Sequence, residues 1–124
     1  MASVQKTFAL ILGLALLLVG ILGFVSNPLV GESAIFTVNT PQTILHLIGG
    51  LIGLYVGLKG EGPMFNMVIG WLGIILGIVG FIPGLGHTEG DLLNTWLNIN
   101  QSITILHLAI GIVSLAVYYG ASKQ

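Results

Sequence analysis

Four runs of apolar residues without a single Asp, Glu, Lys or Arg constrain this chain more than any other feature of its sequence. They extend over residues 8–25, 42–58, 64–82 and 103–119. At a rise of about 1.5 Å per residue, helices of this length can cross the roughly 30 Å hydrocarbon layer of a membrane. The chain is 55% hydrophobic and 6% charged, whereas a soluble domain carries about 25% charged residues. We therefore predict an all-α integral membrane protein of four transmembrane helices, with residues 1–124 forming a single domain.

Much of the sequence occurs twice. The pentapeptide Thr-Ile-Leu-His-Leu stands at residues 43–47 and again at 104–108, and residues 12–25 align with 69–82. The offset between the copies grows from 57 to 61 residues, so the second copy carries an insertion in its loop. We predict two tandem helix-loop-helix repeats, over about residues 7–59 and 64–120. Because each repeat contains an even number of spans, the repeats run parallel about a pseudo-twofold axis along the membrane normal.

Few charges are available to set the orientation in the membrane. Lys6 precedes the first run, Lys59 lies between the second and third, and Lys123 follows the fourth, so all three fall on one side. Lysine and arginine are enriched in the cytoplasmic loops of membrane proteins. We therefore expect both termini in the cytoplasm. The two longer loops, which carry three of the four acidic residues, lie on the opposite side.

Both longer loops are too apolar to be simple solvated linkers, and we expect them to lie on the membrane or on a partner protein. Residues 26–40 and 83–101 each contain several large apolar side chains. In the second loop, Leu92, Trp96 and Ile99 recur at helical spacing. This pattern predicts a short interfacial helix with the tryptophan at the depth of the lipid head groups. Of the two interpretations, we favour a loop that lies on lipid over a docking site.

Many of the 19 glycines lie within the predicted spans, at spacings that share one helix face. Small residues allow membrane helices to approach closely. The stripes indicate either a homodimer seam or packing within one four-helix bundle. We favour the bundle, because four glycine-rich helices in one short chain are expected to pack against one another before they pack against a second chain. The glycines predicted to pack are Gly13, Gly20, Gly49, Gly53, Gly57, Gly70, Gly73, Gly77, Gly80 and Gly111.

The repeated pentapeptide contributes two histidines, His46 and His107. Each shares a helix face with a glycine one turn further on, Gly50 or Gly111, and the repeat axis makes the two histidines symmetry mates. A symmetric pair of inward histidines in a membrane bundle can ligate a b-type haem, with the small residues making room for the macrocycle. The same pair can hold a transition-metal ion, since imidazole is a common ligand.

A structural role for these histidines is the alternative that we favour, and it needs no cofactor. A neutral imidazole near a helix N-terminus can form a hydrogen bond with a loop carbonyl or with a polar side chain of the neighbouring repeat. Asn39, Asn100, Thr43 and Thr104 lie close by in sequence. Duplication of the sequence copies a histidine that forms a structural hydrogen bond as readily as one that binds a cofactor, so the repeat itself does not distinguish the two roles. We therefore expect no cofactor, with haem b as the alternative.

A second candidate metal site lies in the second longer loop. His87, Glu89 and Asp91 alternate along the chain, and imidazole and carboxylate groups together can bind a divalent ion from outside. Solvated loops of this composition are far commoner than metal sites. The simpler interpretation is a solvated loop.

Several residues and motifs that carry chemistry are missing from the sequence. There is no cysteine, which excludes disulfides, iron–sulfur clusters and covalent haem attachment. No Walker loop, G-x-S-x-G or H-E-x-x-H motif occurs, and no span carries a carboxylate for proton transfer. An enzyme or a proton-coupled transporter is therefore disfavoured, and a net charge of −1 argues against nucleic-acid binding.

Several short motifs resemble those of a known family. They are FALILG at residues 8–13, VGILGF at 19–24, the 36–39 run leading to 44–47 with Gly50, and GFIPG at 80–84. They are similar to the pattern of a family of small prokaryotic four-helix membrane proteins called domain of unknown function 4383. The resemblance covers nearly the whole chain and implies a four-span protein of the prokaryotic inner membrane, without an assigned reaction. The family pattern includes His46 and a histidine near the start of the fourth helix, which His107 would be, whereas the long polar loop at 88–100 departs from it.

These features lead to one main hypothesis and two alternatives. We expect a small protein without catalytic activity that serves as a structural or accessory subunit of a larger membrane assembly. It would contact lipid and other membrane proteins through its spans and apolar loops. One alternative is a bis-histidine haem b protein that transfers electrons through His46 and His107. The other is a small pore or carrier along the pseudo-twofold axis, which the apolar spans disfavour.

Overall fold

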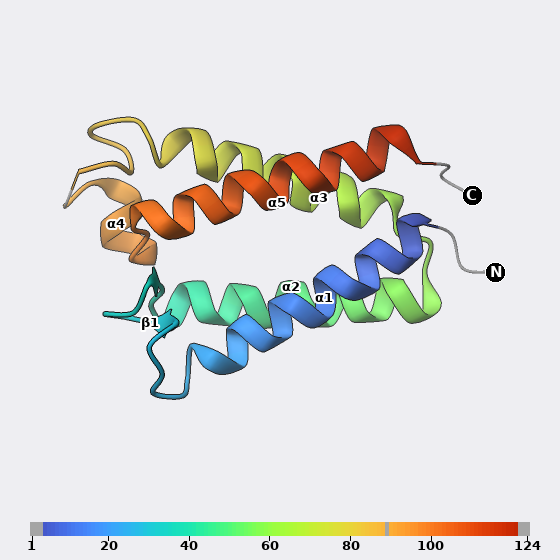
Figure 1. The fold of residues 1–124 in the computed structure, drawn as a ribbon, viewed down its shortest axis with the longest axis horizontal. Coiled ribbons are helices and arrows are strands. Elements are labelled where there is room, and N and C mark those ends of the chain that lie inside the picture. The colour runs from blue at the N-terminus through green and yellow to red at the C-terminus, as the bar shows by residue number, and fades with distance from the viewer. Residues whose placement is uncertain (1–3, 89, 122–124) are drawn as a thin grey trace.

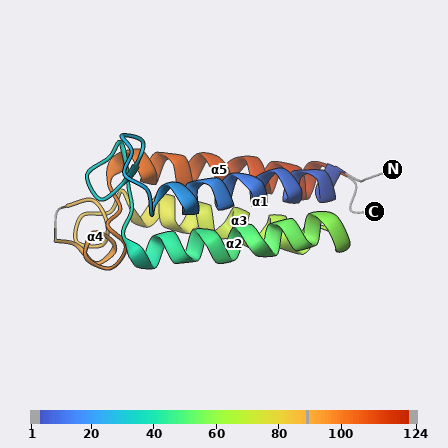
Figure 2. The ribbon, with the colours of Figure 1, turned by 90° about the horizontal axis from the view of Figure 1, so that it is seen from below.

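The computed structural model of the chain describes residues 4–88 and 90–121. The protein is mostly helical, and its elements in chain order are α1 (Val4–Leu22), β1 (Val30–Gly31), β2 (Phe36–Thr37), α2 (Thr40–Lys59), α3 (Pro63–Val79), α4 (Leu92–Leu97) and α5 (Gln101–Gly120) (Figure 1). The four long helices lie side by side, with α4 and both strands gathered at one end (Figures 1 and 2). We call this end the loop end, and the opposite end, where α2 connects to α3, the turn end.

Three of the described helices, α1, α2 and α5, are long and apolar enough to cross a membrane. The helix α3 is also apolar but has 17 residues, because it ends before the apolar run at 64–82 does. The N–H groups of Phe81 and Ile82 donate to carbonyls three residues earlier, which tightens the last turn. Pro83 then prevents the helix from continuing. The chain after α1 tightens in the same manner, with the N–H groups of Phe24 and Val25 donating to carbonyls three residues earlier, so that α1 ends at Leu22, before the predicted end at residue 25.

Asparagine side chains begin the two helices that follow the loops. The Oδ1 atoms of Asn39 and Asn100 accept hydrogen bonds from the backbone N–H groups of Gln42 and Ile103, each at 3.0 Å. An extended asparagine before a helix satisfies N–H groups that the helix itself leaves free. Consequently α2 and α5 begin directly after these asparagines, slightly before the apolar runs in the sequence.

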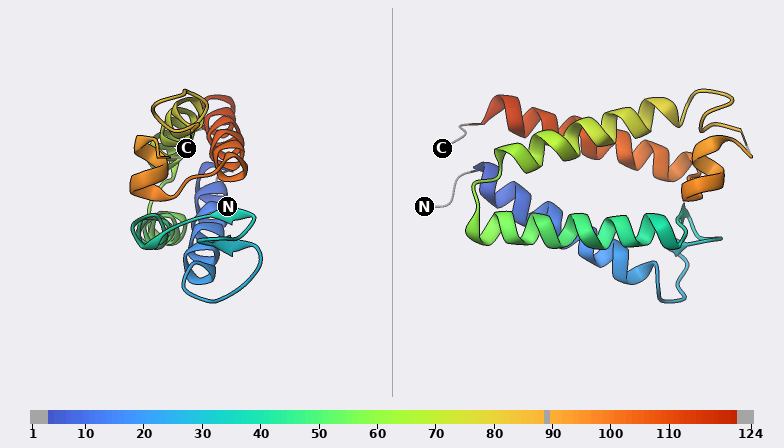
Figure 3. Two further views of the ribbon diagram at one scale, coloured as in Figure 1. Left: turned by 90° about the vertical axis from the view of Figure 1, so that its left-hand side faces the viewer. Right: turned by 180° about the vertical axis from the view of Figure 1, so that it is seen from behind.

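The long helices pack as two pairs, α1 with α2 and α3 with α5 (Figure 3). Glycines allow the backbones within each pair to touch. A Cβ atom added to Gly13 would lie 2.6 Å from the Leu54 nitrogen, and one added to Gly111 would lie 2.6 Å from the Ile74 nitrogen. These distances leave no room for a side chain, so each pair is closed by contact between helix backbones.

The contacts inside the two pairs occur at positions that the sequence alignment makes equivalent. Glycines in and just after α1 face α2, and glycines in and just after α3 face α5. The equivalent contacts are Gly13–Leu54 with Gly70–Leu115, Gly20–Leu47 with Gly77–Leu108, and Gly23–Thr43 with Gly80–Thr104. Both pairs therefore use one packing pattern.

The two pairs are joined at both ends of the bundle. Toward the turn end, Ala9 and Leu12 of α1 are buried together with Phe65 of α3. At the loop end, β1 and β2 form a short parallel sheet with Val30 opposite Phe36, and β2 lies against α5. The apolar core is small, because most large apolar side chains of the long helices face outward, as lipid-facing side chains do.

Candidate functional site

The structure brings His46 of α2 and His107 of α5 together. Their ring centroids are 6.2 Å apart, and the ring planes meet at 63°. Each histidine lies six residues after the first residue of its helix, which corresponds to about 9 Å along the helix axis. The imidazole pair therefore lies between the two helix pairs, nearer to the loop end than to the turn end.

The hydrogen-bonded clamp suggested by the sequence does not form around these imidazoles in the described part of the chain. The Nδ1 atoms of His46 and His107 are buried there without a hydrogen-bond partner. The hydroxyl groups of Thr43 and Thr104, which were possible partners, are also buried and unpaired. The threonine side chains instead face the glycines that follow α1 and α3.

The two asparagines fix the loops rather than the histidines. The Nδ2 atom of Asn39 donates to the Trp96 carbonyl at 2.8 Å, and that of Asn100 donates to the Ile35 carbonyl at 3.0 Å. Each asparagine therefore caps its own helix and holds the loop of the other half of the chain. Proximity along the sequence suggested contact with the imidazoles, whereas the amides point across the loop end.

Two amides that the sequence analysis did not single out strengthen the same junction. The Nε2 atom of Gln42 donates to the Leu97 carbonyl at 2.6 Å. Asn98 has a φ of 53°, a left-handed conformation that asparagine tolerates, and its Nδ2 atom donates to the Val38 carbonyl at 2.9 Å. These bonds hold the loops over the helix starts and thereby position the histidine pair beneath them.

The glycines one turn beyond the histidines do not leave an open slot. A Cβ atom added to Gly50 would lie 2.7 Å from the Leu17 nitrogen, and Gly111 is equally close to the backbone of α3. These two glycines therefore pack against α1 and α3, and they open no space for a porphyrin at their own positions. A single metal ion between the two rings needs no such slot.

The glycines predicted to pack all face another helix of the same chain. Gly49 is the loosest, since its nearest neighbour would be the Leu16 Cδ1 atom at 3.5 Å. A Cβ atom would lie within 3.0 Å of a neighbouring atom at Gly13, Gly20, Gly53, Gly57, Gly70, Gly73, Gly77, Gly80 and Gly111. These glycines are engaged inside the chain, so a homodimer would have to use other residues.

The candidate metal site in the second loop is only partly described, because Glu89 lies outside the described residues. The Oδ2 atom of Asp91 accepts hydrogen bonds from the N–H groups of Gly84 and Thr88 at 2.9 and 2.7 Å. This carboxylate therefore closes its own loop. Among residues 4–88 and 90–121, no group of three or more His, Cys, Asp or Glu side chains is placed to hold a metal ion.

A buried amide cluster at the turn end was missed from the sequence. Gln5 and Asn66 are fully buried. The Nδ2 atom of Asn66 donates to the backbone and side-chain oxygens of Gln5, both at 2.9 Å. The Nε2 atom of Gln5 donates to the Val117 carbonyl at 2.7 Å and the Tyr118 carbonyl at 3.2 Å. An amide inside an apolar run, as Asn66 is in the third, is the signal that indicates such a contact.

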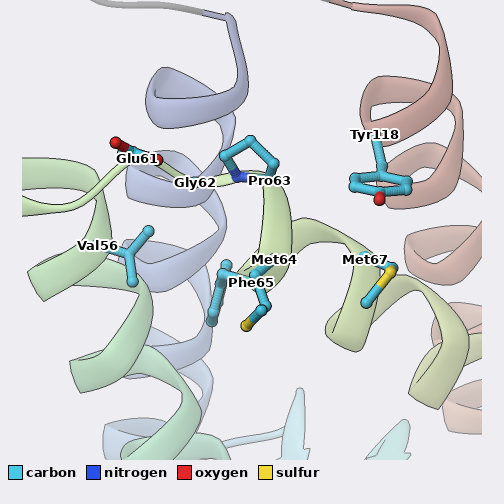
Figure 4. Close-up of a pocket in the computed structure, with 8 residues that line it drawn as sticks. All are labelled: Val56, Glu61, Gly62, Pro63, Met64, Phe65, Met67 and Tyr118. Carbon is cyan, nitrogen blue, oxygen red and sulfur yellow. The ribbon is translucent and has the colours of Figure 1, made fainter. Parts of the chain in front are cut away.

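A hollow of about 460 Å³ lies at the turn end, between the helix pairs (Figure 4). Figure 4 shows Val56 on one side of it and Met67 with Tyr118 on the other. Its lining consists of Val56, Glu61, Gly62, Pro63, Met64, Phe65, Met67 and Tyr118. The hollow is separate from the histidine pair, and its lining is mainly apolar.

These features define the class of protein: a mostly helical membrane protein whose apolar helices are long enough to span the bilayer. The chain belongs to the family described as Domain of unknown function (DUF4383), whose family model matches residues 6–121. No curated protein and no solved structure matches the chain. The match confirms the family that the short sequence motifs indicated, and it assigns no reaction.

Proposed function

We propose that this protein is a small, non-catalytic membrane protein that acts as a structural or accessory subunit of a larger membrane assembly. The observation that carries the proposal is the apolar surface at the loop end. Ile35, Leu92 and Trp96 are 55%, 55% and 67% exposed there, beyond the lipid-facing flanks of the helices. Exposed apolar side chains on loops are typical of a surface that contacts the membrane or another protein, and we assign this one to a partner subunit.

The proposal includes four transmembrane helices arranged as two parallel tandem repeats. The equivalent glycine contacts in the two helix pairs support the duplication. So does the reciprocal pairing of Asn39 with Trp96 and of Asn100 with Ile35. The helix α3, with 17 residues, reaches about 25 Å. Flanking turns and slight thinning of the bilayer accommodate such a short span at modest cost.

The proposed location is the prokaryotic inner membrane, with the turn end in the cytoplasm. Lys6 lies near the start of α1 and Lys59 ends α2, so both lie at the turn end. Lys123 lies outside the described residues. Glu32 and Asp91 lie in the loops at the opposite end. This distribution supports the positive-inside orientation.

Site-specific photocrosslinking in native membranes tests the accessory role. A photoreactive amino acid at Trp96 is expected to give a discrete protein adduct in the host membrane. The matched control is the same amino acid at Ser33, which is also exposed at the loop end but is polar. Adducts to lipid alone from position 96, with no protein adduct, would contradict the accessory role.

A second candidate function is electron transfer by a haem b held between His46 and His107. The approach of the two imidazoles to 6.2 Å favours a ligand between them, whereas the filled space at Gly50 and Gly111 opposes a macrocycle. An absorption spectrum of the protein in mild detergent, oxidised and then reduced with dithionite, decides the matter. A Soret band that disappears in the double variant His46→Ala and His107→Ala would establish haem binding.

A pore or carrier along the pseudo-twofold axis is the third possibility. Such a function requires polar groups along the length of the bundle. The buried polar side chains of the described helices lie mostly toward the two ends, with Gln5 and Asn66 at one and Gln42 and Thr43 at the other. We therefore place this function behind the other two.

A further inference from the structure

The histidine pair presents nitrogen atoms that nothing in the described part of the chain satisfies. The Nδ1 atoms of His46 and His107 are both buried without a partner. A buried polar atom without a hydrogen bond destabilises a protein by about 1–3 kcal/mol. Because the two residues are symmetry-equivalent and adjacent, one ligand placed between them can remove this cost from both rings.

The separation of the rings selects the geometry of such a ligand. An imidazole nitrogen lies about 1.1 Å from its ring centre and binds a first-row metal ion at about 2.0 Å. Two imidazoles on opposite sides of one ion therefore have centroids about 6.2 Å apart, whereas a tetrahedral angle brings them to about 5 Å. The observed centroid separation of 6.2 Å equals that of the nearly linear arrangement, which requires each ring to turn one nitrogen toward the other ring.

The number and charge of the ligands select the ion. In residues 4–88 and 90–121, no third His, Cys, Asp or Glu side chain joins the two histidines. Zinc requires four ligands, and the pair supplies two. Imidazole is neutral, so the ion's charge stays uncompensated in a medium of low dielectric constant. The cost of burying a charge grows with its square, which makes a divalent ion about four times as costly as a monovalent one.

We infer that His46 and His107 together bind one monovalent transition-metal ion, copper(I), in a nearly linear two-coordinate site between α2 and α5. Copper(I) is stable with two nitrogen ligands in a line and accepts imidazole. It needs no additional ligand from the chain. The site goes beyond the accessory role proposed above and does not depend on it.

Silver(I) is the probe of choice, since it has the charge and linear coordination of copper(I) but does not oxidise. The purified full-length protein in mild detergent and chloride-free buffer is incubated with silver nitrate and desalted. Its bound metal is then measured by mass spectrometry. We expect about one silver ion per chain. The variants His46→Leu and His107→Leu are each expected to bind at least tenfold more weakly.

Two matched controls locate the site. His87→Ala removes the third histidine of the chain, which is exposed in a loop, and is expected to keep full binding. The double variant Met64→Leu and Met67→Leu removes the two thioethers that line the hollow at the turn end, and it too is expected to keep full binding. Binding that survives in both histidine variants, or that is lost with the methionines, would overturn the assignment.

X-ray absorption of the copper(I) adduct of the wild-type protein gives a readout that needs no variant. We expect two nitrogen neighbours at about 1.9–2.0 Å and no sulfur. Sulfur neighbours or four ligands would refute the linear site. A Soret band in the protein as purified would likewise refute it, because the pair would then hold haem. Failure of the silver test leaves the crosslink from Trp96 unaffected, so the two proposals fail separately.

Discussion

Two adjacent glycines of α2 have very different surroundings, and the one in tight contact, Gly50, was not among the glycines predicted to pack. A Cβ atom at Gly50 would lie 2.7 Å from the Leu17 nitrogen, whereas one at Gly49 would meet only the Leu16 Cδ1 atom at 3.5 Å. We expect Gly50→Ala to destabilise the protein by about 1–3 kcal/mol, because α1 and α2 must move apart. Gly49→Ala is expected to be neutral or stabilising by up to about 1 kcal/mol through helix propensity. Unfolding by SDS in mixed micelles measures both, and equal effects would contradict the packing described.

The buried amide cluster gives a second prediction at the residue scale. Asn66→Leu removes the donor to two oxygens of Gln5 and leaves them buried without that bond. We expect a loss of stability of about 1–3 kcal/mol. Gln101→Leu, at an exposed position on α5, is the control and is expected to change stability by less than about 0.5 kcal/mol.

A double-mutant cycle separates the cluster from simple loss of packing. Gln5→Leu and Asn66→Leu are expected to be non-additive, with a coupling energy between about 0.5 and 3 kcal/mol, because the two side chains are directly bonded. Additive losses in the cycle would mean that the hydrogen bonds contribute nothing beyond the volume of the side chains.

At the scale of elements, the helix caps can be dissected because each asparagine has two roles. Asn39 accepts from Gln42 as a cap and donates to Trp96 across the loop end. Asn39→Asp keeps the acceptor and removes the donor, whereas Asn39→Ala removes both. We expect the alanine variant to lose about 1–2 kcal/mol and the aspartate variant less. At Asn100, the alanine variant is likewise expected to lose more stability than the aspartate variant. Equal losses of stability for alanine and aspartate would show that the side-chain acceptor of the cap contributes nothing.

The long helices could be predicted from the sequence because each is an uninterrupted apolar run. Their ends could not be located as well. The helix α2 begins at Thr40 because an asparagine caps it, and α3 ends at Val79 because the last turn tightens before Pro83. Apolar composition continues through such turns, so composition alone extends the run. The short helix α4 was predicted from helical spacing and lies at Leu92–Leu97.

The histidine pair could be anticipated because the repeated pentapeptide places both residues alike in their helices. The partners of the asparagines and of Gln5 could not. They are backbone carbonyls that lie between 57 and 116 residues away along the chain. A carbonyl is present in every residue, so its position in space leaves no trace in the sequence. The donors are visible in the sequence, and the acceptors emerge only from the fold.

For the whole molecule, the orientation can be tested directly because the chain has no cysteine. Glu32 and Glu61 are both exposed, at the loop end and the turn end respectively. We expect Glu32→Cys to react with a membrane-impermeant maleimide on intact spheroplasts. Glu61→Cys is expected to react only after permeabilisation, because the proposed orientation puts the turn end in the cytoplasm. The opposite pattern would mean that the loop end faces the cytoplasm. Reaction of both cysteines on intact spheroplasts would exclude any topology that has the two ends on opposite sides of the membrane.

The reciprocal bonds at the loop end have a consequence for the way the two halves depend on each other. Asn39 donates to the carbonyl of Trp96 and Asn100 donates to that of Ile35, so neither half supplies the acceptor for the side-chain N–H group of its own capping asparagine. This exchange is the self-complementary contact that two identical subunits make across a twofold axis. Each half, expressed as a chain of its own, would carry an unpaired amide and an unpaired carbonyl that a second half satisfies. The molecule thus has the bonding of a dimer within a single polypeptide.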